Sequence, residues 1–194
     1  MPYTTQLEQM IYSSPQLMLR LVHLRQLHTH AYLSAGVIRN LVWANLHDQA
    51  YCLDETEIDV VFYDLKDQLG YEEQRLSQEL KQKFPSNDWD VVNQAYVHVW
   101  YKKDDGNAID QYSSLFDALS GWVETSTAIA VRLQQSGQLE WIAPFGLNDL
   151  FELKLRWNPR LVSYATFVQR IESKRFLQRW DKLVIVDQPF RDQE

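Results

Sequence analysis

The chain has 194 residues, one cysteine and a formal net charge of −7, with 45% hydrophobic and 13% aromatic residues. This balance is that of a globular protein, and it argues against nucleic acid or an anionic membrane as the main partner, because both attract clustered Lys and Arg. The lone Cys52 excludes an intramolecular disulfide framework. The sequence shows neither a basic leader nor an apolar run of membrane length, so we expect a cytoplasmic protein.

The length favours a single domain over residues 1–194, organised in three segments. Residues 1–30 carry two helices, because leucines recur at helical spacing on both sides of Pro15, and one of the two preceding serines is the expected N-cap. Residues 31–100 form the core, and residues 101–194 complete one wall of a cleft.

The core segment mixes short strands with helices. AYLSAG, residues 31–36, is predicted as a strand that passes at once into a helix over 37–47. TEIDVVFYD, residues 56–64, is a second strand rich in β-forming residues. A charged amphipathic helix over 71–84 and the longest candidate strand, over 89–103, follow.

The C-terminal segment is rich in strand patterns and turn signals. The sequence as a whole therefore predicts an α+β fold, with a small mixed sheet flanked by helices and a β-rich C-terminal part. The expected elements are a helix at 112–122 capped by Ser113 or Ser114, a hairpin at 127–145 turning at QSGQ, a strand at 150–158, a helix at 160–174 and a strand at 182–186.

The junction at Gly36 is the first candidate for chemistry. A strand that ends here and starts a helix points the free N–H groups of that helix into a crevice, and glycine allows a ligand close to the backbone. Arg39, on the first helical turn, would add a fork for a phosphate group. The alternative is a tight turn in which Gly36 serves only its backbone conformation, and this is the simpler interpretation of the junction alone.

Two acids on the next strand are the second candidate. Glu57 and Asp59 lie two residues apart, so they share one face while Ile58, Val60 and Phe62 share the other. Like charges held this close favour a cation between them, and Mg²⁺ prefers hard oxygen ligands. The alternative is the solvent-facing side of an edge strand.

Together the two features resemble the polymerase-β-type nucleotidyltransferase superfamily, which places a glycine-containing strand–helix turn before an acidic-apolar-acidic strand. More specifically, the chain resembles a group of small bacterial nucleotidyltransferase family proteins, over about residues 32–183. The resemblance rests on the segments AGVIRNLVW, EIDVVFYD, NQAYVH, DALSGWVETSTAIAVRL and IAPFGLNDLFELKLRWNP.

The resemblance implies transfer of a nucleotidyl group from an NTP to an acceptor. Glu57 and Asp59 would hold Mg²⁺, and Gly36 with the backbone N–H groups after it would face the phosphates. Arg39 would support the phosphates or the leaving pyrophosphate. The chain departs from the superfamily at Val37, where Ser is usual, and at Glu57, where Asp is usual, and its glycine-to-acid gap is longer.

Further site candidates come from neighbouring segments. Asp90, at the start of the next strand, is the candidate for a third carboxylate, and Asn93 shares the face of Val91 and would reach substrate there. The alternative for Asp90 is a polar residue that begins a strand. Glu124 and Thr125 precede a strand where a loop would meet a sugar or base.

Asp149 lies in the turn APFGLNDLF and is carried as a candidate for the cleft, with a turn or helix cap as its alternative.

The sequence thus predicts a Mg²⁺-dependent nucleotidyltransferase whose acceptor is a hydroxyl-bearing small molecule, a protein side chain or an RNA end. The negative charge favours a small molecule over a long nucleic acid. The alternative, motivated by Val37 and Glu57, is a degenerate nucleotidyltransferase fold that binds a nucleotide or protein partner without catalysis. A third possibility is a structural interaction protein, in which the two acids would lie far from any cavity.

Overall fold

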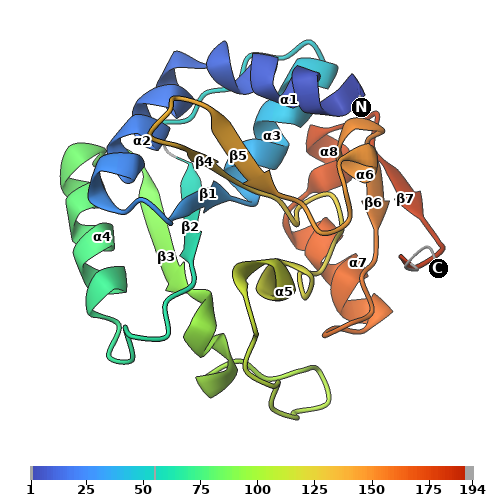
Figure 1. The fold of residues 1–194 in the computed structure, drawn as a ribbon. Helices are drawn as coiled ribbons and strands as arrows, with labels where there is room; N and C mark the ends of the chain where they lie inside the picture. The colour runs from blue at the N-terminus through green and yellow to red at the C-terminus, as the bar shows by residue number, and fades with distance from the viewer. Residues whose placement is uncertain (1, 55, 191–194) are drawn as a thin grey trace.

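A mixed five-stranded sheet forms the centre of the structure, a computed structural model that describes residues 2–54 and 56–190 (Figure 1). The first strand is antiparallel to both of its neighbours, whereas the second and third strands are parallel. In spatial order the strands are β3 (Asp88–Asn93), β2 (Glu57–Phe62), β1 (Tyr32–Ser34), β4 (Ala130–Leu133) and β5 (Leu139–Ile142).

Helices pack against the five-stranded sheet, and the C-terminal segment adds further helices and a second, smaller sheet. The first three helices pack against one another and the sheet, while α4 lies along β3 (Figure 1). A small parallel pair, β6 (Lys154–Arg156) and β7 (Val184–Val186), forms a second sheet. The helices are α1 (Pro2–Tyr12), α2 (Pro15–Leu27), α3 (Gly36–Leu46), α4 (Tyr71–Lys83), the 3₁₀ helix η1 (Gln94–Val99), α5 (Leu115–Leu119), α6 (Asn148–Phe151), α7 (Tyr164–Ser173) and α8 (Phe176–Arg179).

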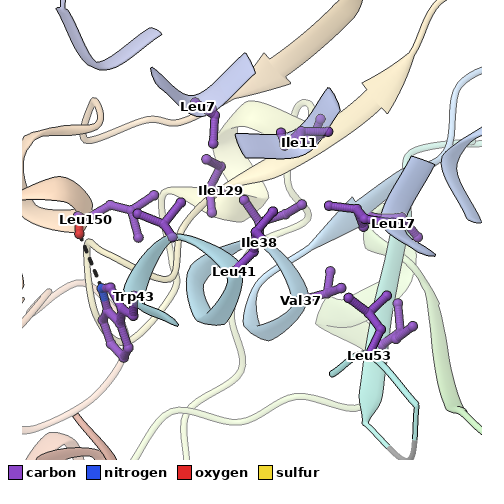
Figure 2. Packing of buried hydrophobic residues seen from close by; sticks show 14 of the residues in the cluster. Leu7, Ile11, Leu17, Val37, Ile38, Leu41, Trp43, Leu53, Ile129 and Leu150 are labelled. Atoms are coloured by element: carbon purple, nitrogen blue, oxygen red, sulfur yellow. Dashed lines mark hydrogen bonds between the residues drawn. The ribbon is translucent and has the colours of Figure 1, made fainter. Parts of the chain in front are cut away.

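The core joins the N-terminal helices to the C-terminal segment through α3. Figure 2 shows Leu7 of α1, Ile38 of α3 and Ile129 before β4 packed together, all nearly inaccessible to solvent. The indole N–H of Trp43 donates to the backbone oxygen of Leu150 at 3.2 Å. Full burial of each such aliphatic side chain stabilises the fold by about 1.5–3 kcal/mol. The packing of these side chains therefore fixes the position and direction of α3.

The predicted fold class is confirmed, and so is the division of faces on β2. Ile58, Val60 and Phe62 are fully buried, whereas Glu57 and Asp59 lie on the other face. The predicted hairpin is present as β4 and β5. Within the described residues, every helix is too short or too polar to cross a membrane.

The long strand predicted over 89–103 is wrong. β3 ends at Asn93, and the chain turns into the 3₁₀ helix η1. The physical reason is the Asn93 side chain, whose Oδ1 accepts from the Ala95 backbone N–H at 3.2 Å and so caps the new helix. Alternating valines beyond this point mimic a strand pattern that the cap interrupts.

The strand predicted over 150–158 is also shorter than expected. Its first residues belong to the short helix α6, and only Lys154–Arg156 pair as β6. The last long helix begins at Tyr164 rather than Arg160, because Ser163 is its N-cap and accepts from the Thr166 N–H. The helix predicted over 112–122 shortens to α5, with Ser114 confirmed as its cap.

Candidate functional site

A cleft of about 590 Å³ lies between β2 and β3 on one side and the segment that carries α7 and α8 on the other. Its lining divides into two halves along the strands. The charged half contains Gly36, Glu57, Asp59, Asp90, Arg170, Lys174 and Arg179. The apolar half contains Val61, Val92, Val97, Trp100, Tyr101, Tyr112, Trp122 and Leu161.

Three acids come together on the strand wall of the cleft. Asp59 of β2 is the register partner of Asp90 on β3, so their side chains leave the same face of adjacent strands about 4.8 Å apart. Glu57 precedes Asp59 by one pleat on the same face. The structure therefore brings together the three carboxylates that the sequence singled out, at the edge of one cavity.

The electrostatics of these acids are unfavourable in the absence of a cation. Burial raises the pKa of Asp59 to about 6, with the charges of Glu57 and Asp90 adding to the shift, while Arg39 and a backbone hydrogen bond from Gly36 oppose it. Burial, and then Glu57, also raise the pKa of Asp90. Mutual repulsion among oxygens that face a cavity is the arrangement that a bound cation would relieve.

The Gly36 backbone needs no glycine for its conformation. The strained residue is the preceding Ala35, at φ 53° and ψ −119°, whereas Gly36 is the first residue of α3 and lacks a positive φ. A Cβ at Gly36 would meet only the side chains of Arg39 and Asn40, at 3.7 and 3.9 Å, which is ordinary contact. The turn-only alternative for Gly36 is therefore unsupported, and the missing side chain instead leaves the backbone open to the cleft.

Val37 points away from the cleft. Its side chain is fully buried in the core and lies beside Leu53 (Figure 2). A hydroxyl at this position would enter the core rather than the cavity, so the contribution of residue 37 to a ligand is confined to its backbone N–H at the start of α3. The departure from the usual serine thus removes no group from the cleft in this geometry.

Arg39 lines the cleft, but its guanidinium is already occupied. It donates to Thr127 Oγ1 at 2.8 Å and to Asn40 Oδ1 at 3.0 Å, and it lies 3.6 Å from Glu124. Burial lowers its pKa to about 10, and Glu124 opposes this shift. The guanidinium that was predicted to bind a phosphate therefore binds other side chains of the protein.

Two aromatic rings complete the environment of Arg39. Its guanidinium carbon lies 4.9 Å from the ring centroid of Trp43 in α3 and 4.4 Å from that of Phe176 in α8. Cation–π contacts of this kind are worth about 2 kcal/mol when desolvated. Arg39 therefore ties the beginning of α3 to the last helices of the chain.

The wall of the cleft formed by the segment that carries α7 and α8, here called the helix wall, has three cationic side chains that were not predicted from the sequence. Arg170 and Lys174 follow each other at helical spacing along and just beyond α7, and Arg179 ends α8. Lys174 Nζ lies 3.7 Å from a Glu57 carboxylate oxygen across the cleft. The signal was present as the four-residue spacing of Arg170 and Lys174 in a predicted helix, but nothing in the sequence placed that helix opposite the acids.

Glu124 lies at the centre of the network behind this wall. It is 1% exposed, accepts from Thr127 Oγ1 at 2.8 Å and receives the Arg170 Nε–H at 3.0 Å. The sequence placed Glu124 in a loop near a substrate; the structure places it in the cleft lining as the common partner of Arg39 and Arg170.

Three other candidates lie apart from the cleft lining. The Thr125 hydroxyl donates a hydrogen bond to Asp149 at 2.6 Å, and the Asp149 carboxylate also forms an ion pair with Arg156 at 2.8 Å. Thr125 and Asp149 therefore belong to a buried structural cluster. Asn93 faces away from Asp90 because adjacent strand residues alternate, and its side chain bonds the backbone of Asp64 and Ala95.

The mixed sheet, the helix that begins at Gly36 and the acidic pair on the next strand define a polymerase-β-type nucleotidyltransferase fold. The chain belongs to a nucleotidyltransferase family, whose profile matches residues 22–185.

Solved structures agree with this assignment. One, determined by NMR and described as a CCA-adding enzyme head domain, is 28% identical with a TM-score of 0.79, and the match covers 95% of this chain and 96% of that one. A CCA-adding enzyme in its apo form II is 18% identical with a TM-score of 0.58, over 92% of this chain and 44% of that one. A CCA-adding enzyme in complex with CTP is 17% identical with a TM-score of 0.57, over 93% and 43%.

The last two likenesses show the fold alone, and this chain spans less than half the length of those enzymes. A search of curated protein sequences found no match.

Proposed function

We propose that the protein is a Mg²⁺-dependent nucleotidyltransferase that moves a nucleotidyl group from an NTP to an acceptor. The observation that carries the proposal is the charged half of the cleft, where Glu57, Asp59 and Asp90 face a wall of cations beside the first turn of α3. Carboxylates suit a divalent cation, and cations with a helix N-terminus suit a triphosphate.

The donor set fits Mg²⁺. Glu57 and Asp59 would hold it, with Asp90 as the third carboxylate, and all three offer the hard oxygen atoms that this ion prefers. Within residues 2–54 and 56–190, no three such side chains already converge on one point, so the exposed Glu57 and Asp90 would have to change rotamer on binding. When bound, the ion reduces the charge on the triphosphate oxygens in an in-line displacement.

The residues of the chain have separate tasks in this proposal. The backbone N–H of Val37, on the first turn of α3, faces the phosphates, and the missing side chain of Gly36 leaves room for close approach, while the Gly36 N–H keeps its hydrogen bond to Asp59. Lys174 and Arg179 balance the charge of the β- and γ-phosphates and of the leaving pyrophosphate. Arg39 and Glu124 hold the helix wall in position, so Arg39 acts behind the site rather than as a direct phosphate ligand.

Two measurements test the proposal. An NTP with Mg²⁺ should raise the melting temperature, because a ligand at 100 times its dissociation constant stabilises the folded state by about 2.7 kcal/mol. Pyrophosphate release should fall by more than about 100-fold in Asp59→Asn, since even the outer partners of metal ligands are worth 10- to 100-fold.

The matched control for Asp59→Asn is Asp88→Asn. Asp88 lies on β3 close to Asp90 and opposite Glu57, but it is exposed, pairs with Lys81 at 3.2 Å and is outside the cleft. This control should keep full activity. Equal pyrophosphate release by Asp59→Asn and the unmodified protein, despite NTP binding, would instead support the binding-only alternative, which the lack of a preformed three-carboxylate cluster in the described residues favours.

A further inference from the structure

The apolar half of the cleft has a composition unlike the charged half. Among the described residues that line it, none is Lys or Arg, and four are aromatic: Trp100, Tyr101, Tyr112 and Trp122. Trp100 is 62% exposed, and its ring meets that of Tyr101 edge-on at 6.2 Å. Exposed aromatic surface at a cavity rim marks a place where a flat ligand can be covered.

At the apolar end of the cleft, the backbone at Gly121 allows neighbouring side chains to approach it closely. A Cβ at Gly121 would lie 2.9 Å from Leu161 Cδ1 and 3.1 Å from the Tyr112 hydroxyl, so glycine allows both groups to close against the chain. The Tyr63 hydroxyl donates a hydrogen bond to the Tyr112 backbone oxygen at 2.7 Å. These contacts pack the inner part of the apolar half closely against the chain.

The charge near this end is slightly negative. Lys102 and Lys103 adjoin Asp104, Asp105 and Asp110 in the loop that follows Trp100. The guanidinium of Arg160 lies 5.9 Å from the Tyr112 ring centroid and is paired with Asp117 at 2.5 Å. No lysine or arginine is among the described residues that line this half, so a phosphate-bearing ligand would meet no cation in its lining.

Along the strands, the carboxylates form the part of the charged half that adjoins the apolar half. On β2 the cleft-facing order is Glu57, Asp59, Val61, and on β3 Asp90 precedes Val92. α7 runs the other way across the cleft, from the region of Leu161 toward Arg170. The carboxylates thus stand at the boundary between the cationic end and the aromatic end.

In-line displacement assigns a role to each end, and this step rests on the function proposed above. If pyrophosphate leaves toward Lys174 and Arg179, the attacking oxygen must approach the α-phosphorus from the opposite side, which is the apolar half. We infer that the apolar half binds the acceptor, and that the acceptor is a small, uncharged aromatic molecule with a hydroxyl group.

The chemistry of the step balances with these groups. The acceptor oxygen forms a bond to the α-phosphorus while the bond from that phosphorus to the bridging oxygen of pyrophosphate breaks, and pyrophosphate departs into the charged half. The hydroxyl proton is released to solvent, which reaches this part of the cleft beside the exposed Asp90.

The test measures binding of three uncharged aromatic alcohols, adenosine, 2-phenylethanol and 2-(2-naphthyl)ethanol, by saturation-transfer NMR on the intact chain. Binding is measured without nucleotide and again with a saturating Mg²⁺-NTP complex. We expect at least one probe to bind under both conditions. With the Mg²⁺-NTP complex bound, 2-phenylethyl phosphate, the charged counterpart of one probe, should bind at least 10-fold more weakly than that probe.

Variants locate the probe. Trp100→Ala and Tyr101→Leu should weaken probe binding at least 5-fold while changing NTP affinity less than 2-fold. Tyr71→Ala, at a 67% exposed aromatic residue outside the cleft, is the matched control and should bind the probe normally.

Displacement of the probe by NTP would overturn the inference, because the apolar half would then hold the base of the NTP. Absence of probe binding, or preference for the phosphorylated counterpart while the Mg²⁺-NTP complex is bound, would also overturn it. NTP binding is followed separately by thermal stabilisation in the same samples, so a failed nucleotidyltransferase proposal is distinguishable from a misplaced acceptor.

Discussion

The strand wall and the helix wall of the cleft hold their charges by different means. On the strand wall, the backbone register of β2 and β3 places Asp59 beside Asp90, and no side-chain partner is required to keep them there. On the helix wall, Arg170 is held by the buried Glu124, which also faces Arg39. The first wall therefore depends on hydrogen-bonded backbone, whereas the second depends on one buried carboxylate.

Removing that carboxylate should give the largest effect. Glu124→Ala leaves the buried Arg39 guanidinium without its charge partner and releases Arg170, and breaking a buried ion pair typically destabilises a protein by about 3–5 kcal/mol. Denaturant unfolding measures the loss. The control is Glu152→Ala, which removes a half-exposed partner of Lys154 and should change stability by less than about 1 kcal/mol. Equal losses in the two variants would contradict a special role for Glu124.

Removing cations from the helix wall should weaken nucleotide binding without unfolding the chain. Charge-assisted hydrogen bonds contribute about 1.5–3 kcal/mol each, so Lys174→Ala combined with Arg179→Ala should raise the dissociation constant for an NTP at least 10-fold. Titration calorimetry with Mg²⁺ present measures this. Lys154→Ala combined with Lys182→Ala removes the same charge outside the cleft and should leave affinity within 2-fold, so a matched decline in both pairs would indicate only a general charge effect.

Repulsion on the strand wall should appear as a pH-dependent penalty on stability. The pKa of Asp59 rises from 3.8 to about 6 on folding, so the folded chain binds this proton more tightly, and stability declines as pH rises between those values. Without divalent cations at pH 8, Asp59→Asn should therefore be more stable than the unmodified protein by roughly 1–3 kcal/mol. The gain should vanish near pH 3.5. A variant less stable at pH 8 would show that Asp59 supports the fold instead.

The smallest expected change in stability comes from substituting Gly36, which tests whether the turn needs a glycine there. Gly36→Ala introduces a side chain at the first residue of α3 with only ordinary contacts, so stability should rise by about 0.5–1 kcal/mol. NTP affinity should fall at the same time, because the new methyl group occupies the approach to the backbone. Thermal melts with and without Mg²⁺-NTP measure both. Lower stability would indicate that Gly36 is structural after all.

The two walls also differ in how far the sequence predicts them. Period-two alternation in EIDVV places Glu57 and Asp59 on one face whatever the rest of the fold does, and Asp90 follows because β3 pairs in parallel with β2. The cations depend on where α7 packs, which is a long-range result that local periodicity does not contain. Sequence could indicate a basic helical face, but not its neighbour.

The places where the structure differs from expectations drawn from the sequence have local causes of the same kind. Arg39 was predicted as a phosphate fork because its place on the first helical turn is visible in sequence, whereas the ring of Phe176 that covers it is not. The long strand predicted through residue 103 failed because one side chain, that of Asn93, caps a new helix. Asp149 and Thr125 satisfy each other, and that buried hydrogen bond has no sequence signature.

The position of Arg39 between Trp43 and Phe176 has a consequence for the order in which the site is made. During synthesis the acidic strands can pair as soon as β3 has left the ribosome, and domains begin to fold from their N-terminal side. At that stage Arg39 still lacks both Glu124 and the ring of Phe176, and the cations opposite the acids have not been made. A nascent chain therefore holds the repelling carboxylates before it holds the cations that would balance a triphosphate, and the cleft is complete only when α7 and α8 have been made.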